Sequence, residues 1–117
     1  MPMPMPIPIP MSMPALYPTF APSRSELDAR TGDVLLQFGV DWCSHCQAAE
    51  PAIAEALKAF PGLSHLRIED GAGRPLGRSF RIKLWPTLVL LRDGQERDRL
   101  VRPTQAAQVL TLLRTLG

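Results

Sequence analysis

The chain has 117 residues and a formal net charge of +2, from 13 lysines and arginines against 11 acidic residues. This length suits one compact domain and not two. The small net charge gives no argument for nucleic-acid binding, and no apolar run is long enough to span a membrane.

The N-terminal segment, residues 1–22, is rich in methionine and proline, and Met1 to Pro10 alternate methionine or isoleucine with proline. Alternate prolines remove backbone donors and fix φ, which excludes a helix or a central strand. We therefore predict an extended or disordered arm over residues 1–22, with a short edge strand over residues 15–22, followed by a folded domain over residues 23–117. The segment lacks the basic start and unbroken apolar stretch of a signal peptide, so we expect a cytoplasmic protein, with the periplasm as the alternative.

The rest of the chain alternates between helical and strand patterns. The predicted elements are a short helix from Ser23 or Ser25 to Ala29 or Arg30, a buried strand over residues 33–39, a helix over 43–60, a strand over 63–69, a short helix around 76–81, strands over 88–91 and 95–101, and an amphipathic helix over 104–116. Strands joined through helices run parallel, and Asp93-Gly94 is a hairpin signal. The order predicts an α/β fold, with a mixed four- to five-stranded sheet between helices on both faces.

The two cysteines, Cys43 and Cys46, lie where the first buried strand leads into a helix. This places Cys43 at the helix N-terminus, where unpaired N–H groups and the helix dipole favour a thiolate. Such sites lower a cysteine pKa from about 8.5 to roughly 3.5–7.5. We therefore expect Cys43 to be a reactive thiol.

The spacing of the pair favours redox chemistry. Residues three apart lie on one helix face, about 5–6 Å apart at Cβ, which is within reach of a disulfide. Cys43 can then attack a partner disulfide, and Cys46 can release the reduced partner by attacking Cys43. Two alternatives remain open: half of a zinc site with His45 and His65 as nitrogen ligands, or a pair of inert buried thiols. We expect no metal and no organic cofactor.

From Gly32 to Gly117 the chain resembles the thioredoxins. The resemblance rests on the strand leading into Trp42-Cys43-Ser44-His45-Cys46, on Pro51 in the following helix, on Trp85-Pro86-Thr87 before the third strand, and on the hairpin and terminal helix. It implies a thioredoxin-like fold and a thiol–disulfide oxidoreductase with a Cys43–Cys46 redox disulfide. Cys43 would be the nucleophile and Cys46 the resolving thiol. Trp85 and a cis Pro86 would form the peptide-binding edge, with Trp42 as an apolar rim.

Departures from the thioredoxin pattern indicate a specialised member. Ser44-His45 replaces the usual Gly-Pro, and an imidazolium at His45 would stabilise the thiolate and make the disulfide a stronger oxidant. Gln37 replaces a buried aspartate and cannot titrate, so the proton of Cys46 must use another route. Gly39 replaces an aromatic residue and leaves room near the pair. Arg102 replaces a glycine at which partners approach, which would block broad recognition or select acidic partners.

We therefore predict a monomeric enzyme that acts on a few protein partners carrying disulfides or thiols. It would also need an upstream thiol reductant or oxidant. The alternative is a non-catalytic interaction module of the same fold, in which the cysteine pair is a redox-sensitive latch.

Overall fold

The computed structural model describes residues 16–116. Its elements are α1 (Arg24–Asp28), β1 (Asp33–Gly39), α2 (Ser44–Leu57), β2 (Ser64–Glu69), α3 (Pro75–Ser79), β3 (Thr87–Arg92), β4 (Gln95–Val101), α4 (Ala106–Leu113) and the 3₁₀ turn η1 (Arg114–Leu116). The predicted elements from residue 23 onward are therefore confirmed in kind and order. Helix ends differ by a few residues, as in the last helix, where a 3₁₀ turn replaces the final α turn.

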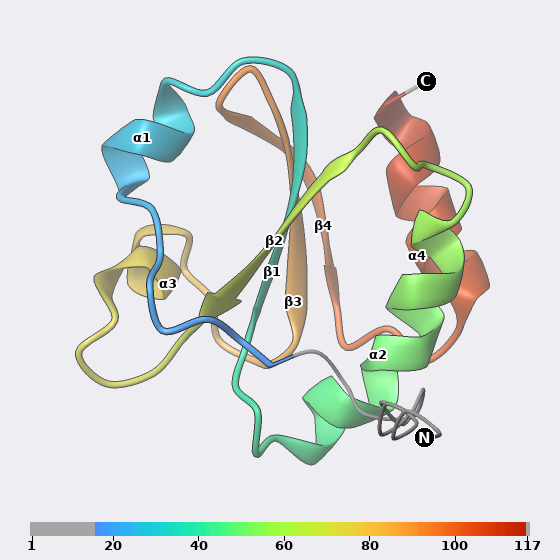
Figure 1. Ribbon diagram of the computed structural model, residues 1–117, viewed down its shortest axis with the longest axis horizontal. Helices are drawn as coiled ribbons and strands as arrows, with labels where there is room; N and C mark the ends of the chain where they lie inside the picture. The colour runs from blue at the N-terminus through green and yellow to red at the C-terminus, as the bar shows by residue number, and fades with distance from the viewer. Residues whose placement is uncertain (1–15, 117) are drawn as a thin grey trace, which may run out of the picture.

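The sheet has the strand order β2-β1-β3-β4, with β1 and β2 parallel and the other pairs antiparallel. Helices α1 and α3 cover one face, and α2 and α4 cover the other (Figure 1). This is the predicted α/β sandwich. In the described part of the chain no helix is long and apolar enough to cross a membrane.

The predicted edge strand is wrong where the structure describes it, because residues 16–22 form no strand and the sheet of the described residues has four strands. Pro18 and Pro22 have no N–H to give to a sheet ladder. The segment is held instead by the Tyr17 N–H, which donates to Asp41 Oδ1 at 2.7 Å. Residues 1–15, the remainder of the predicted arm, lie outside the described residues.

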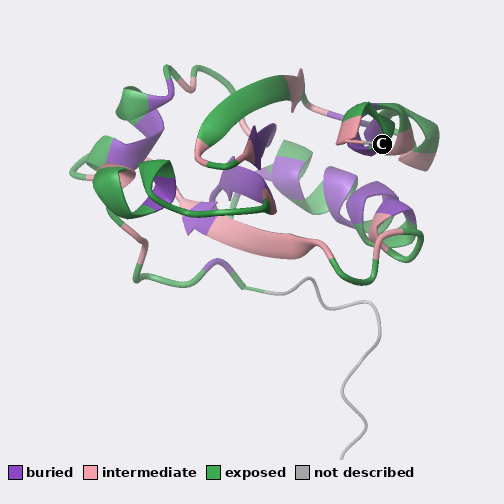
Figure 2. Cartoon of the chain, turned by 90° about the horizontal axis from the view of Figure 1, so that it is seen from above, coloured by how far each residue is buried: buried purple, intermediate pink, exposed green. Residues whose placement is uncertain are grey.

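Alternation along β1 divides the core into two layers. Val34, Leu36 and Phe38 pack against α1 and α3, whereas Leu35 packs against α2 and α4. Gln37 has the same parity as Leu35 and therefore faces α2. Figure 2 shows the buried residues in the central strands, with exposed residues on the outer turns of the helices. β1 is thus covered on both faces, and its α2-facing residues lie beneath the cysteine pair.

The turn from β1 into α2 positions the cysteines. Cys43 is the N-cap of α2, with extended backbone angles of φ −82° and ψ 122°. Its carbonyl accepts the first helical hydrogen bond from the Gln47 N–H at 3.0 Å. Cys43 therefore lies at the helix start, as predicted, and Cys46 lies one turn further along the same face.

Candidate active site

The two thiols are in contact but are not joined by a disulfide in this structure. Cys43 is 8% exposed and Cys46 is 1% exposed. They form a small apolar cluster with Val40, against which Trp85 packs. An incoming sulfur atom can therefore reach Cys43 more readily than Cys46.

The environment of Cys46 opposes its ionisation. Burial raises the pKa of this thiol to about 11, and a hydrogen bond with Cys43 raises it too. Hydrogen bonds from the Val40 backbone N–H and the Tyr17 hydroxyl act in the opposite direction and lower the pKa. The groups that hydrogen-bond to the Cys46 sulfur are thus a backbone N–H, a hydroxyl and a thiol, and none of them is a carboxylate.

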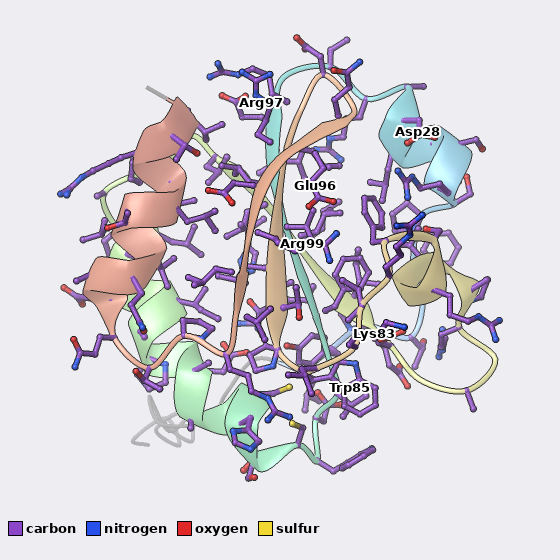
Figure 3. All side chains as sticks on the ribbon, turned by 180° about the vertical axis from the view of Figure 1, so that it is seen from behind. Asp28, Lys83, Trp85, Glu96, Arg97 and Arg99 are labelled. Carbon is purple, nitrogen blue, oxygen red and sulfur yellow. The ribbon has the colours of Figure 1, made fainter. Side chains whose placement is uncertain are left out.

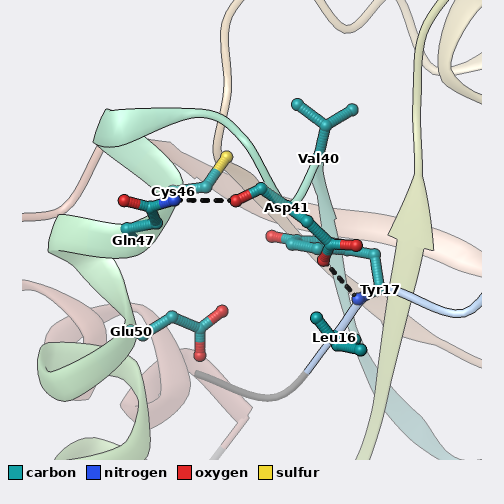
Figure 4. Close-up of a pocket in the computed structure, with 7 residues that line it drawn as sticks. All are labelled: Leu16, Tyr17, Val40, Asp41, Cys46, Gln47 and Glu50. Atoms are coloured by element: carbon teal, nitrogen blue, oxygen red, sulfur yellow. Dashed lines mark hydrogen bonds between the residues drawn. The ribbon is translucent and has the colours of Figure 1, made fainter. Parts of the chain in front are cut away.

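Gln37 is the centre of a buried polar network beneath the pair. It is 0% exposed, and its Nε2 donates to the Tyr17 hydroxyl and to Glu50 Oε1, both at 2.8 Å. Both carboxylate oxygens of Glu50 accept from the guanidinium of Arg67 on β2. Figure 4 shows Glu50, Tyr17 and Cys46 around the small pocket that this network adjoins.

His65 belongs to this network. It pairs with Leu35 across β1 and β2, and its Nε2 lies 2.8 Å from Gln37 Oε1. Since an amide oxygen only accepts, the hydrogen bond requires a proton on Nε2. Burial and the positive charge of Arg67 lower the pKa of His65 to about 4. Within residues 16–116, no three His, Cys, Asp or Glu side chains form a metal-binding group.

Two tryptophans form the rim beside the cysteines. Trp42 is 75% exposed and meets Trp85 edge-to-face, with ring centroids 5.7 Å apart. The indole N–H of Trp85 donates to Asp70 Oδ2 at 2.8 Å, and the Trp85–Pro86 peptide bond is cis. Figure 3 shows Trp85 at the end of the sheet where the two sulfur atoms lie. The structure therefore brings Trp42, Trp85 and Pro86 together with the cysteine pair.

Arg102 follows β4 and joins the same group of residues. Its φ is +51°, a left-handed conformation in which glycine is far commoner than arginine. Its backbone N–H donates to the Pro86 carbonyl at 2.9 Å, and its side-chain Nε donates to the Trp85 carbonyl at 2.8 Å. The arginine thus binds the backbone on both sides of the cis bond.

His45 lies on the first turn of α2 and is exposed. A charge on an exposed side chain is screened by water, so its effect on either sulfur is small.

Tyr17 and Glu50 belong to the site although no sequence motif indicated them. Tyr17 lies in the segment assigned to the arm, yet it is only 6% exposed and hydrogen-bonds to Gln37 from 20 residues away. The sequence held one signal for such a residue, because Gly39 replaces an aromatic residue and leaves a space beside the cysteine pair that another side chain can fill. A domain boundary at residue 22 therefore cuts through the site.

The fold and the Cys43–Cys46 pair at the start of α2 define the chain as a thiol–disulfide oxidoreductase. The profile of the family Thioredoxin matches residues 19–115, and the chain belongs to the thioredoxin family. Thioredoxin 2 from Pseudomonas aeruginosa PAO1, solved in its reduced form, is 51% identical with a TM-score of 0.80, over 89% of this chain and 96% of that one.

Curated relatives are more distant. A thioredoxin H-type of Oryza sativa subsp. indica is 26% identical over 84 residues, which is 72% of this chain and 69% of the rice protein. A thioredoxin of Mycoplasma pneumoniae is 25% identical over 88 residues, which is 75% of this chain and 86% of that protein. The family resemblance read from the sequence is thereby confirmed.

The depressed pKa of His65 predicts acid sensitivity. Between pH 6.5 and pH 4 the unfolded chain binds a proton at His65 that the folded protein does not, so the free energy of unfolding falls as pH is lowered through this window. The expected loss is on the order of 1 kcal/mol, since the partial exposure of the ring weakens the effect. His65→Gln keeps an N–H for Gln37 and cannot titrate. Urea unfolding from pH 7 to pH 4 should show a flatter pH dependence for this variant; equal slopes would contradict the prediction.

Proposed function

We propose that Cys43 is the attacking nucleophile, that Cys46 is the resolving thiol, and that Trp42, Trp85, Pro86 and Arg102 bind the protein substrate. The observation that carries this assignment is the position of Cys43 at the N-cap of α2, at the edge of the cluster, with Cys46 buried behind it. Trp42 and Trp85 give a partner an apolar rim beside the more accessible sulfur.

The exchange proceeds in two substitutions at sulfur. The Cys43 thiolate attacks the substrate disulfide, forming a Cys43–substrate disulfide while the other substrate sulfur leaves as a thiolate and takes a proton. Cys46, as a thiolate, then attacks the sulfur of Cys43. The Cys43–Cys46 bond forms, the bond to the substrate breaks, and its electron pair leaves on the second substrate sulfur. The substrate gains two electrons and the enzyme pair loses them.

The exposure of His45 bears on the direction of exchange. An exposed charge pair contributes roughly 0.2–1 kcal/mol. For a two-electron couple, in which 1.4 kcal/mol corresponds to about 30 mV, this is about 5–20 mV. Thioredoxin has a reduction potential of about −270 mV and a strong oxidant about −120 mV, and this difference is far larger than the contribution expected from His45. We therefore propose that the protein reduces disulfides and is itself re-reduced by an upstream thiol reductant.

Arg102 supports a narrow substrate range. A peptide that docks at the cis-proline edge needs the Trp85 carbonyl as a hydrogen-bond acceptor, and the Nε of Arg102 already donates to that oxygen. Docking would turn the guanidinium toward the peptide, where a bidentate pair with a carboxylate replaces the lost hydrogen bond. We propose that the preferred partners carry Asp or Glu near the reactive cysteine. The monomeric state and the cytoplasmic location stay predictions.

Single-cysteine variants test the two roles. Cys46→Ser should accumulate a mixed disulfide with a disulfide-containing protein such as insulin, because the resolving step is removed. Cys43→Ser should form none and should lose turnover completely. Mass spectrometry under non-reducing conditions distinguishes the two adducts. A stable adduct at Cys46 in the Cys43→Ser protein would reverse the assignment, and absence of turnover in the unmodified protein would support the interaction-module alternative.

The reduction potential of the pair, measured by equilibration with dithiothreitol and glutathione buffers, should lie within a few tens of millivolts of about −270 mV. His45→Gln removes the imidazole and should make the potential more negative by about 5–20 mV. A potential near about −120 mV, or a His45→Gln shift of 100 mV, would show that His45 dominates and that the protein is an oxidant.

Arg102→Gly tests substrate selection, because glycine adopts the φ of +51° without strain. The variant should reduce insulin several-fold faster and should lose any preference for a disulfide peptide flanked by Glu over the same peptide flanked by Gln. Arg97→Ala is the control, since Arg97 lies at the opposite end of the sheet from Trp85 (Figure 3). Unchanged kcat/KM ratios in Arg102→Gly would remove Arg102 from the substrate site.

A further inference from the structure

The Tyr17 hydroxyl and the Cys46 sulfur meet in the space above Gly39. A Cβ atom on Gly39 would lie 2.6 Å from the sulfur and 2.6 Å from the hydroxyl oxygen, so no other residue type fits between them. The tyrosine enters from the N-terminal segment, where its own backbone N–H is fixed to Asp41 (Figure 4). Its hydroxyl is therefore held against a sulfur that takes part in the reaction.

The hydrogen bonds around Gln37 fix the direction in which the Tyr17 hydroxyl donates. Gln37 Oε1 accepts from His65, so the two hydrogens of Nε2 are directed to Glu50 and to the Tyr17 oxygen. The Tyr17 oxygen is thus an acceptor from Gln37. Its own hydrogen is free to point to the sulfur of Cys46, which borders the same space above Gly39 and whose pKa the tyrosine lowers.

Tyr17 is protonated at neutral pH. Burial raises its pKa well above the usual value of 10. It therefore cannot take up the proton of Cys46 as a base. It can only donate a hydrogen bond, and a donor is strongest toward an ionised partner.

We propose that Tyr17 is a catalytic residue whose hydroxyl donates a hydrogen bond to the Cys46 thiolate during resolution of the mixed disulfide. This inference rests on the proposed roles of Cys43 and Cys46. The Cys46 proton passes to water, and the thiolate is held by Tyr17 and by the Val40 N–H until it attacks the sulfur of Cys43. In the reverse reaction the same two donors stabilise Cys46 as it leaves. His65 and Gln37 are positioning residues, because they orient the hydroxyl without touching the sulfur.

The charged groups facing this sulfur do not replace the tyrosine. Cys43 is the N-cap of α2, Glu50 lies on α2, and Asp41 lies in the turn before it. Each of these groups is an acid, so none can donate to a thiolate once ionised. The carboxylate of Glu50 is bound by Arg67 and Gln37. Tyr17 is thus a side-chain donor beside Cys46 that can stabilise negative charge on its sulfur.

The test is the reaction of the reduced protein with 5,5′-dithiobis(2-nitrobenzoate), followed at 412 nm by stopped flow. The first thionitrobenzoate is released when Cys43 attacks and the second when Cys46 resolves the adduct, so the two steps separate in time at reagent concentrations that make the first release the faster one. Tyr17→Phe should leave the first phase unchanged and slow the second by about 10–100-fold at pH 7. Phe20→Ala is the control from the same segment, because Phe20 is 83% exposed.

A pH titration separates hydrogen bonding from packing. In the Cys43→Ser background, Cys46 is the one thiol that absorbs at 240 nm on ionisation, and ionisation of Tyr17 is followed separately at 295 nm and subtracted. Loss of a donor raises the midpoint by about one pH unit or more, whereas an opened and hydrated pocket lowers it toward the usual cysteine value. A lowered or unchanged midpoint in Tyr17→Phe would overturn the proposal.

Tyr17 is the single tyrosine of the chain, so it can be replaced selectively by an analogue that is expected to change the rate of the second phase in the opposite direction. Biosynthetic replacement with 3,5-difluorotyrosine makes this one hydroxyl a stronger donor, so the second phase should become faster and the midpoint of Cys46 should fall. An unaltered second phase would count against Tyr17 even if Tyr17→Phe fails to fold. Loss of the first phase in the unmodified protein would instead refute the roles of the cysteines.

Discussion

The packing of Cys46 against the bare backbone of Gly39 is the contact on which the arrangement of the site depends. The chain leaves β1, turns over four residues and starts α2 with Cys43 as its N-cap, which places the next helical turn directly over the end of the strand. Any side chain on Gly39 would displace the sulfur. One cysteine is therefore fixed and buried, while the other lies at the edge where a partner can reach it.

The buried carboxylate near the pair carries its own counter-ion. A carboxylate directly beneath the sulfur can exchange a proton with it, but Gln37 occupies that place in this protein. The acidic group is Glu50, one helical turn beyond Cys46, and Arg67 neutralises it from the neighbouring strand. Hydrogen bonding to Glu50 also raises the pKa of Arg67, so the guanidinium stays charged. The neutral amide of Gln37 and the neutral hydroxyl of Tyr17 therefore lie between the Glu50 carboxylate and the sulfur of Cys46.

Local patterns were sufficient to predict the elements and the cysteine position, because apolar alternation and helix start signals act over a few residues. The strand at 33–39 and the hairpin at Asp93-Gly94 are examples. Tyr17 was missed because its contacts join residues 20 or more positions apart and because the flanking prolines resemble those of an arm. The contact of Arg102 with the Trp85 carbonyl depends on a backbone φ that no local pattern reports.

The space beside Cys46 can be filled either by a side chain at position 39 of β1 or by a side chain from the segment before α1, which in this protein is Tyr17. Thioredoxins usually supply an aromatic ring there from the strand itself, whereas this protein removes the strand side chain and brings in a ring from a segment upstream of α1. The two solutions exclude each other sterically. A side chain at position 39 in this protein would therefore conflict with Tyr17 as well as with Cys46. The part of the upstream segment that carries Tyr17 therefore belongs to the site, and its removal would leave the space beside Cys46 empty.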